Sequence, residues 1–222
     1  KTATTKITPA RKLRILQEAI MLGADFIDIE LAEGKKTIEG LKNLCAQYGN
    51  KTQMIVSHHD LKATPSVAKL KDLFRRCAAT KPAVVKIATW ARSDEDNLRV
   101  LSLIPYARRH KQNIIALCMG ETGQISRVAG TQMGNYLSFA ALAPRMKSAP
   151  GQLTADEMNL LKKIIGGKKK QPPAKAPSPQ NFLLLGNPVA HSLSPLVHNA
   201  ALRERRINET YMACCVNDLD NA

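Results

Sequence analysis

Short apolar runs alternate with amphipathic segments from residue 9 to about residue 165. The apolar runs are six or seven residues long and nearly continuous, which is typical of strands that are covered on both faces. We expect such strands at 25–31, 52–57, 83–89, 113–119 and 136–142. The alternation predicts βα units and a parallel sheet.

Helix starts can be recognised between these runs. Thr64, followed by a proline, is expected to cap a helix over 64–79, and Ser93 precedes three acidic residues at the start of a helix over 93–110. A first helix over 9–22 has no strand in front of it, so we expect that a strand before it is missing.

A change of composition divides the chain. Residues 166–180, GGKKKQPPAKAPSPQ, lack apolar periodicity and are expected to form a linker. Residues 1–165 then form one domain, and 181–222 belong to a second. The second domain is expected to begin with a strand that enters a tight polar turn, followed by a helix over 195–205 and a strand near 209–216.

The charge and the cysteines narrow the class of protein. The 33 Lys and Arg against 18 Asp and Glu give a net charge of +15, which attracts nucleic acid, acidic surfaces or small anions. Only 4% of the residues are aromatic and no DNA-binding motif occurs, so we favour a solvated basic surface over nucleic-acid binding. The five cysteines have no metal-site or disulfide spacing. With no membrane span or signal segment apparent, we expect a cytoplasmic protein that contacts no membrane.

Lys86 is a candidate nucleophile because it lies inside the apolar run VVKIA. An ammonium group is costly to bury and tends to lose its proton, which leaves an amine that can attack a ketone and form a Schiff base. A lysine at a strand end that reaches solvent is an equally good interpretation of this run alone.

His59 lies at the end of the preceding predicted strand, where an α/β barrel displays its catalytic groups. A histidine there could move protons near neutral pH. Because side chains alternate along a strand, His58 and His59 cannot face the same way. Taken without Lys86, a structural role for this histidine would be the better interpretation.

Four motifs occur in one order along residues 9–165: IVSHHDLKATPS, VVKIAT, GQISRVAG and SAPGQ. With them the segment closely resembles the type I 3-dehydroquinate dehydratases. Their pattern is a strand ending in Ser-x-His-Asp, then Lys-Ile-Ala, Ser-Arg-x-x-Gly and Ser-Ala-Pro-Gly-Gln. The resemblance implies a hydro-lyase without metal or cofactor, acting on a small molecule, 3-dehydroquinate.

The resemblance also implies roles for individual residues. Lys86 would form the imine with the substrate ketone, and His59 would move protons. Arg127 would clamp the substrate carboxylate, against the alternative of a surface ion pair. Ser148 and Gln152 would belong to a mobile loop that closes over the substrate and bonds its hydroxyls.

Two further pairs of residues keep two interpretations each. Met119 and Phe139 match pocket contacts of the family but could equally be core. Asp28 and Glu30 lie two apart on one strand, so they point to the same side. They could hold a proton network near Lys86 or only satisfy their neighbours.

After the linker, LLLGNPVAHSLSPLVHNAAL is similar to the opening of shikimate dehydrogenases. By that match Ser192 and Ser194 would hydrogen-bond the carboxylate of shikimate, although Ser194 could also be a helix cap. Such enzymes use NADP, but the resemblance places the NADP-binding fold and the catalytic lysine beyond residue 222, so we expect no nicotinamide binding here.

The expected fold is therefore an incomplete (β/α)8, or TIM, barrel with about five of its eight βα units, followed by the start of an α/β substrate-binding domain. The resemblance places substrate-binding groups and the group that orients the histidine in the missing strands, which puts activity of this chain in doubt. Open sheet edges predict association, and a homodimer is one form of it. The alternatives are a class I aldolase, against which SAPGQ argues, and an inactive basic fragment that binds anionic polymers.

Overall fold

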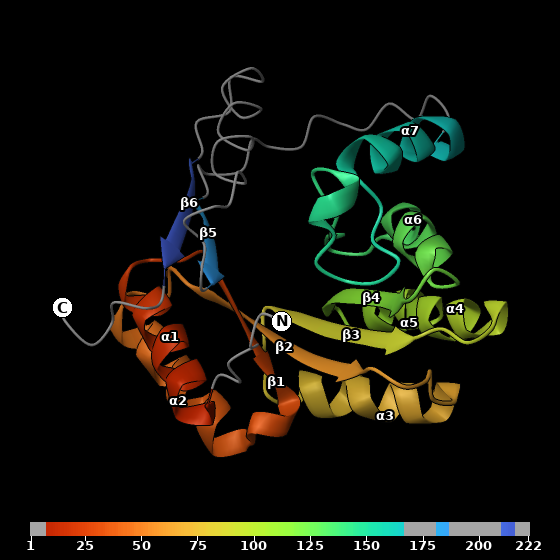
Figure 1. The fold of residues 1–222 in the computed structure, drawn as a ribbon. Coiled ribbons are helices and arrows are strands. Elements are labelled where there is room, and N and C mark those ends of the chain that lie inside the picture. The colour runs from red at the N-terminus through yellow and green to blue at the C-terminus, as the bar shows by residue number, and fades with distance from the viewer. Residues whose placement is uncertain (1–7, 167–180, 187–209, 216–222) are drawn as a thin grey trace. The chain divides into compact units, whose positions relative to one another are not determined.

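The structure is a computed structural model that describes residues 8–166, 181–186 and 210–215. It forms a four-stranded sheet in the order β1-β2-β3-β4 and a separate pair, β5-β6 (Figure 1). Most of the expected linker, and the predicted helix over 195–205, lie outside the described residues. By contacts the chain divides into two compact units, one of which comprises residues 28–39 and 54–172.

The four expected strands up to residue 119 are confirmed. They are β1 (Phe26–Glu30), β2 (Gln53–Asp60), β3 (Val84–Trp90) and β4 (Asn113–Met119). β3 pairs in parallel with both β2 and β4. The register aligns Ser57 with Lys86 and Ile115, so these side chains share one face of the sheet.

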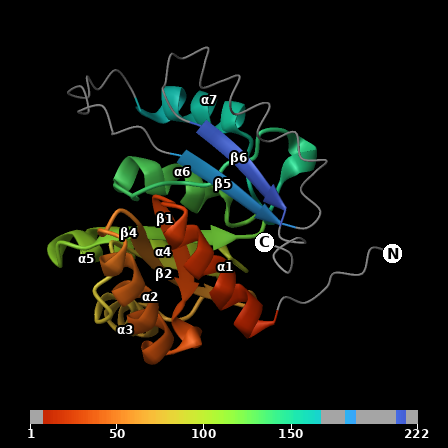
Figure 2. The ribbon, with the colours of Figure 1, turned by 90° about the vertical axis from the view of Figure 1, so that its left-hand side faces the viewer.

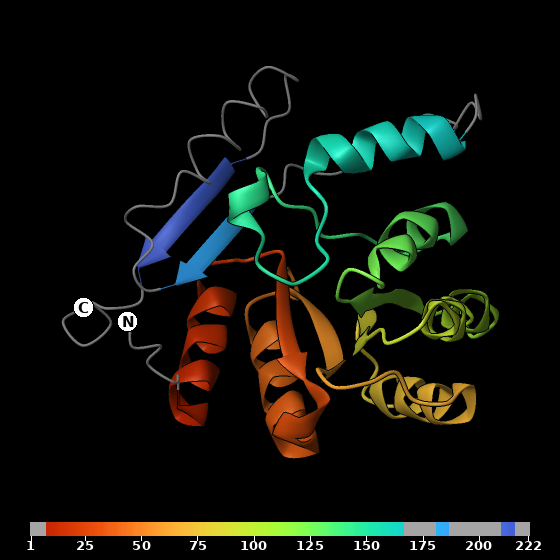
Figure 3. The same cartoon turned by 45° about the vertical axis from the view of Figure 1, so that its right-hand side comes forward.

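Helices cover the other face. In chain order they are α3 (Val67–Ala78), α4 (Asp94–Leu101), α5 (Leu103–Arg109) and α6 (Gln124–Met133), and Figure 3 shows them following one another around the outside of the strands. The buried core contains fully enclosed residues such as Phe74, Ile87 and Leu103. Strands covered in this way need the continuous apolar runs seen in the sequence.

The remaining elements complete the described chain. They are α1 (Pro9–Met21), η1 (Leu31–Glu33), α2 (Lys35–Gln47), η2 (Pro144–Met146), α7 (Ala155–Gly166), β5 (Asn181–Gly186) and β6 (Thr210–Cys215). α1 is the predicted first helix, and its Thr8 hydroxyl accepts from the Arg11 N–H. β5 and β6 are parallel and confirm the two strands expected after the linker (Figure 2).

Two predictions about helix ends are wrong. The cap of α3 is Ser66, whose hydroxyl accepts from the Lys69 N–H. Thr64 is instead buried, and its hydroxyl donates to the carbonyl of Trp90. A tertiary hydrogen bond therefore replaces the expected cap.

The helix expected over 93–110 is two helices, α4 and α5, separated by Ser102. Pro105 has no N–H to donate to the carbonyl of Leu101, the last residue of α4, so the helical ladder is interrupted there. The predicted start is confirmed, because Ser93 and Asp96 form a capping box.

The predicted strand over 136–142 does not form. This segment makes one isolated parallel bridge, from Ala141 to Thr154, and the Tyr136 N–H donates to the Ile114 carbonyl. The side chain of Asn135 occupies both backbone groups of Ala116 on β4: its oxygen accepts from the N–H, and its nitrogen donates to the carbonyl. A side chain therefore takes the place at the edge of β4 that a fifth strand needs.

Candidate active site

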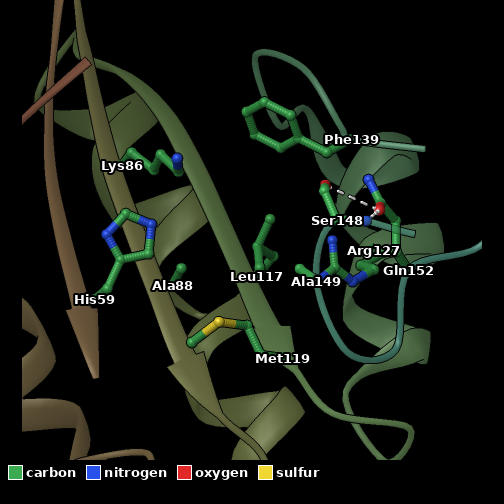
Figure 4. Close-up of a pocket in the computed structure, with 10 residues that line it drawn as sticks. All are labelled: His59, Lys86, Ala88, Leu117, Met119, Arg127, Phe139, Ser148, Ala149 and Gln152. Carbon is green, nitrogen blue, oxygen red and sulfur yellow. Dashed lines mark hydrogen bonds between the residues drawn. The ribbon is translucent and has the colours of Figure 1, made fainter. Parts of the chain in front are cut away.

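A cavity of about 280 Å³ opens at the face of the sheet that the helices leave free. Figure 4 shows ten side chains around it. They are His59, Lys86, Ala88, Leu117, Met119, Arg127, Phe139, Ser148, Ala149 and Gln152. The cavity therefore brings together all five residues that the sequence assigned to the dehydratase site.

Lys86 lies in the middle of β3 and enters the cavity from its sheet wall. Its side chain is only 13% exposed, so it is not a strand-end lysine that reaches solvent. The Nζ atom lies 2.7 Å from Oδ2 of Asp28 and 4.9 Å from the centre of the Phe139 ring. A carboxylate and an aromatic face thus hold this amine in place.

His59 enters the cavity from β2, beside Lys86 (Figure 4). It pairs in register with Ala88, whereas His58 pairs with Ile87, so the two histidines face opposite ways as expected. Nδ1 of His59 is hydrogen-bonded to Oε1 of Glu30. When Nδ1 carries the proton for this bond, Nε2 has a free lone pair.

β1 supplies both of these carboxylates. Asp28 and Glu30 lie two residues apart and therefore point to one side of the strand, the first to Lys86 and the second to His59. The sequence analysis expected the group that orients the histidine to be missing. In this chain Glu30 contacts the ring, so a carboxylate on β1 is available to orient the histidine.

Arg127, on α6, closes the opposite side of the cavity. It is 2% exposed, so it is not the surface ion pair of the alternative interpretation. Its Nη2 donates to the carbonyl of Pro150 at 3.5 Å, and its Nε is buried without a partner among the described residues. Burial lowers the pKa of the guanidinium from its ordinary value. Even so, a guanidinium keeps its charge near neutral pH, and this buried cation can still accept an anion.

The segment from Ser148 to Gln152, named here the SAPGQ loop, forms the rim next to Arg127. Oε1 of Gln152 accepts from the backbone N–H of Ser148 at 2.8 Å and from its hydroxyl at 3.2 Å (Figure 4). Gln152 is 4% exposed. Because its oxygen is occupied within the loop, its amide N–H groups are what it can offer to a ligand.

The floor between the two polar sides is apolar. Ala88, Leu117 and Met119 form it, and Phe139 lies above Lys86. Met119 and Phe139, which the sequence left open between pocket and core, both line the cavity. An amine at one side and a guanidinium at the other suit a small molecule that carries a carbonyl and an anionic group.

Other kinds of site are not apparent in the described ranges. No group of three or more His, Cys, Asp or Glu side chains there could hold a metal ion, and no described helix is long and apolar enough to cross a membrane. Cys45, Cys77 and Cys118 are free and buried, and burial raises the pKa of the Cys77 thiol to about 12. Ser192 and Ser194 lie outside the described residues, so their roles stay predictions.

Two family models match the chain. Residues 2–169 match the type I 3-dehydroquinase model, and residues 184–222 match the shikimate dehydrogenase substrate binding domain. Among solved structures, the chain is similar to 3-dehydroquinate dehydratase from Geobacillus kaustophilus, with a TM-score of 0.66 and 28% identity over 72% of this chain and 61% of that one. The resemblance supports the predicted fold, a partial TIM-like barrel.

A protein that carries both activities and a further type I enzyme match as well. The dehydroquinate dehydratase and shikimate dehydrogenase from S. pombe AroM covers 97% of this chain, and 38% of its own chain is covered, at a TM-score of 0.61 and 27% identity. A type I enzyme from Clostridium difficile, solved with covalently modified comenic acid, matches 72% of this chain and 62% of its own, at a TM-score of 0.63 and 27% identity.

Curated relatives agree. The 3-dehydroquinate dehydratase of Syntrophobacter fumaroxidans is 37% identical over 72% of this chain. The chloroplastic bifunctional 3-dehydroquinate dehydratase/shikimate dehydrogenase of Arabidopsis thaliana is 35% identical over 92% of this chain. The chain spans 66% of the first relative and 32% of the second. With a dehydratase model matched over most of its length, the chain belongs to the type I 3-dehydroquinase family, and its residues 184–222 match a shikimate dehydrogenase substrate binding domain.

Proposed function

We propose that the chain dehydrates 3-dehydroquinate to 3-dehydroshikimate through an imine on Lys86. One observation carries the proposal: the amine of Lys86 and the buried guanidinium of Arg127, whose Nε has no partner among the described residues, lie on opposite sides of one cavity with an apolar floor. A cyclic substrate that carries both a ketone and a carboxylate fits this arrangement. The SAPGQ loop then offers donors to the ring hydroxyls.

The reaction begins when Nζ of Lys86 attacks the ketone carbon. The resulting carbinolamine loses its oxygen as water, which leaves a positively charged iminium. His59 supplies and removes the protons of these steps. Asp28, beside Nζ, faces the positive charge that the nitrogen carries.

Elimination follows because the iminium withdraws electrons from the neighbouring carbon. A proton leaves that carbon, and its electron pair enters the enamine. The electrons then return as hydroxide leaves the next carbon, taking a proton to become water. Hydrolysis of the new iminium releases the product and restores the amine, so the net change is the loss of one water. The imine itself is the electron sink, so the proposed chemistry needs no metal or cofactor.

Substrate binding is assigned to three residues of the opposite side. Arg127 would hold the carboxylate through two parallel hydrogen bonds, which a planar guanidinium makes well. Ser148 and Gln152 would bond the hydroxyls, and the loop would exclude water from the imine. The covalently modified comenic acid in the related C. difficile enzyme supports covalent chemistry in this family.

Borohydride trapping tests the proposal. The chain is incubated with 3-dehydroquinate, reduced, digested and analysed by mass spectrometry, with the Lys86→Met variant as the control. We expect a stable adduct on the peptide that contains Lys86 and none in the variant. No adduct at Lys86 would contradict the mechanism, and an adduct with dihydroxyacetone phosphate alone would favour a class I aldolase.

The second domain is assigned on its family match alone. Ser192 and Ser194 are proposed to bond the carboxylate of shikimate, because residues 184–222 match the substrate binding domain of shikimate dehydrogenase. A reducing compartment such as the cytoplasm is proposed from the free thiols of Cys45, Cys77 and Cys118. Association into a homodimer stays a prediction.

A further inference from the structure

Two glycines meet where the SAPGQ loop crosses the end of β4. Gly120 directly follows β4, and Gly151 lies in the loop with a φ of +72°. A Cβ atom added to Gly151 would lie 1.9 Å from the carbonyl oxygen of Gly120 and 2.5 Å from its carbonyl carbon. These are backbone atoms and cannot turn aside, so both the space and the backbone conformation require glycine at position 151.

The same contact is hydrogen-bonded. The N–H of Gly120 donates to the carbonyl of Pro150 at 3.2 Å. Nη2 of Arg127 donates to this carbonyl as well, at 3.5 Å. The end of the strand and the buried guanidinium are therefore tied to one peptide group of the loop.

The residue after Gly151 is Gln152, whose side chain closes the loop onto Ser148. Gly151 and Gln152 are both buried, although Pro150 beside them is exposed. The close approach at Gly120 therefore fixes the point from which Gln152 enters the cavity. Without this close approach, neither the side chain of Gln152 nor the hydrogen bond from Arg127 to the Pro150 carbonyl would be held in place by the end of β4.

We infer that the Gly120–Gly151 contact is a latch that holds the SAPGQ loop over the cavity, and that Gly151 is a positioning residue for Gln152 and Arg127. The inference rests on the proposed function for its effect on catalysis, but the latch itself is a property of the unliganded chain. Because the latch already holds the hydrogen-bond donors of the loop over the cavity, the loop loses little conformational entropy when substrate binds.

The chain contains its own reporter of this latch. Trp90, the one tryptophan in the sequence, packs against Gly120 so closely that an added Cβ would meet two of its ring carbons at 3.3 Å. A displacement of Gly120 therefore changes the surroundings of the indole. Tryptophan emission reports the latch without any need for catalysis.

The test compares Gly151→Ala with Gly23→Ala in the full chain. Gly23 has a similar φ of +77° but nothing within 4 Å of an added Cβ, so it controls for backbone strain alone. We expect a shifted Trp90 emission in Gly151→Ala and cleavage by trypsin after Lys147 that is about tenfold faster, because the loop opens more often. Gly23→Ala should match the parent chain in both, and a Gly151→Ala chain that also matches would overturn the latch.

Positioning is tested separately with the borohydride adduct. In Gly151→Ala the concentration of 3-dehydroquinate that gives half of the maximal trapping rate should rise by about tenfold or more, whereas the limiting rate changes less. The double variant Gly151→Ala/Gln152→Ala should need little more 3-dehydroquinate for half-maximal trapping than Gly151→Ala alone, because both changes remove the contact that Gln152 makes with the substrate. The positioning role would be overturned if Gly151→Ala is cleaved faster but traps 3-dehydroquinate like the parent chain. It would also be overturned if the effects of Gly151→Ala and Gln152→Ala on trapping are fully additive.

The two proposals fail in different ways. A parent chain that forms no adduct contradicts the proposed function, while emission and proteolysis still decide the latch. If Gly151→Ala does not fold by circular dichroism, Pro150→Ala replaces it, because it keeps the carbonyl and only frees its backbone. We expect smaller changes in the same direction, and none would contradict the latch.

Discussion

The carboxylate of Asp28 lies 2.7 Å from the amine of Lys86, and the cavity that this amine enters is also lined by the buried guanidinium of Arg127. The Lys86 side chain is 13% exposed and that of Asp28 is 35% exposed, so water only partly screens the pair. In the proposed reaction the lysine nitrogen attacks as a neutral amine and becomes positive as the iminium forms. Asp28 is placed to face the charge that develops on this nitrogen.

Removing Asp28 is therefore expected to slow imine formation. Asp28→Ala loses a charge-assisted hydrogen bond, a contribution of about 1.5–3 kcal/mol, which corresponds to roughly a 10- to 150-fold slower trapping of the Lys86 adduct. Asp28→Asn keeps an oxygen that can accept from Nζ, so its rate should fall between. Equal rates in the parent and Asp28→Ala chains, measured by mass spectrometry of the reduced adduct, would show that Asp28 has no such role.

Glu30 should set the tautomer of His59. Its carboxylate can only accept a hydrogen bond, which favours the proton on Nδ1 and leaves Nε2 able to take one from the reaction. The amide of Glu30→Gln can also donate to Nδ1, so the preference weakens. We expect a mixed tautomer in the ¹⁵N NMR signals of the ring and a loss of about 10²-fold or more in dehydration rate.

Glu39→Gln is the matched control for this change. Glu39 is exposed, pairs with Lys35 one helical turn away, and is not among the residues that line the cavity. This variant should keep both the parent tautomer and the parent rate. A Glu30→Gln chain with the parent tautomer would contradict the assignment of Glu30.

These pairs show where prediction from the sequence reached its limit. Lys86 and His59 could be recognised only from the four motifs taken together, because position in an apolar strand or at its end left a structural interpretation of each residue open. The role of Glu30 could not be derived, because pairing across strands depends on register. The period of two for Asp28 and Glu30 did predict that both would point the same way.

The errors in the fold have a common cause. Asn135 takes the hydrogen bonds of Ala116 that a strand over 136–142 needed, and Thr64 bonds to Trp90 in place of capping α3. Both are side-chain bonds to residues distant in sequence, which local patterns do not reveal. The break before α5 is different, because Pro105 was visible and its missing N–H accounts for it.

The buried guanidinium of Arg127 is expected to lower the stability of the unliganded chain while it contributes to substrate binding. Its buried charge has no anionic partner among the described residues, so the unliganded protein bears its desolvation cost. Replacement by the apolar Arg127→Met is expected to stabilise the unliganded chain by about 1 kcal/mol, or roughly 2–4 °C in Tm. The same variant should lose the rise in Tm that 3-dehydroquinate produces in the parent chain.

Arg75→Met serves as the control, because Arg75 is an exposed arginine that contacts Asp72 on the same helix. It should change neither Tm nor the response to ligand appreciably. Scanning fluorimetry with and without 3-dehydroquinate measures both effects. If Arg127→Met lowers the Tm of the unliganded chain, the guanidinium has a structural role that outweighs its burial.

The lowered pKa of Asp96 predicts that the stability of the fold decreases in acid. Burial alone would raise the pKa of this carboxyl, but the N–H groups of Arg92 and Ser93 and the guanidinium of Arg99 hold it below its ordinary value. Because the folded pKa lies below the unfolded one, this contribution to stability is complete above about pH 4 and is lost as the pH falls through the folded pKa. Asp96→Asn should therefore cost about 0.5–2 kcal/mol at pH 7, as expected for a lost helix cap.

The difference in the free energy of unfolding between the parent and Asp96→Asn chains should shrink as the pH falls below about 4, since the carboxyl of Asp96 in the parent then takes up a proton. Urea unfolding at pH 7, 4 and 3 measures it. Asp72→Asn, on an exposed side chain with one surface partner, should show little difference at any pH. If this difference in the free energy of unfolding stays constant from pH 7 to 3, then the geometry of the cap, and not the charge of Asp96, stabilises the start of α4.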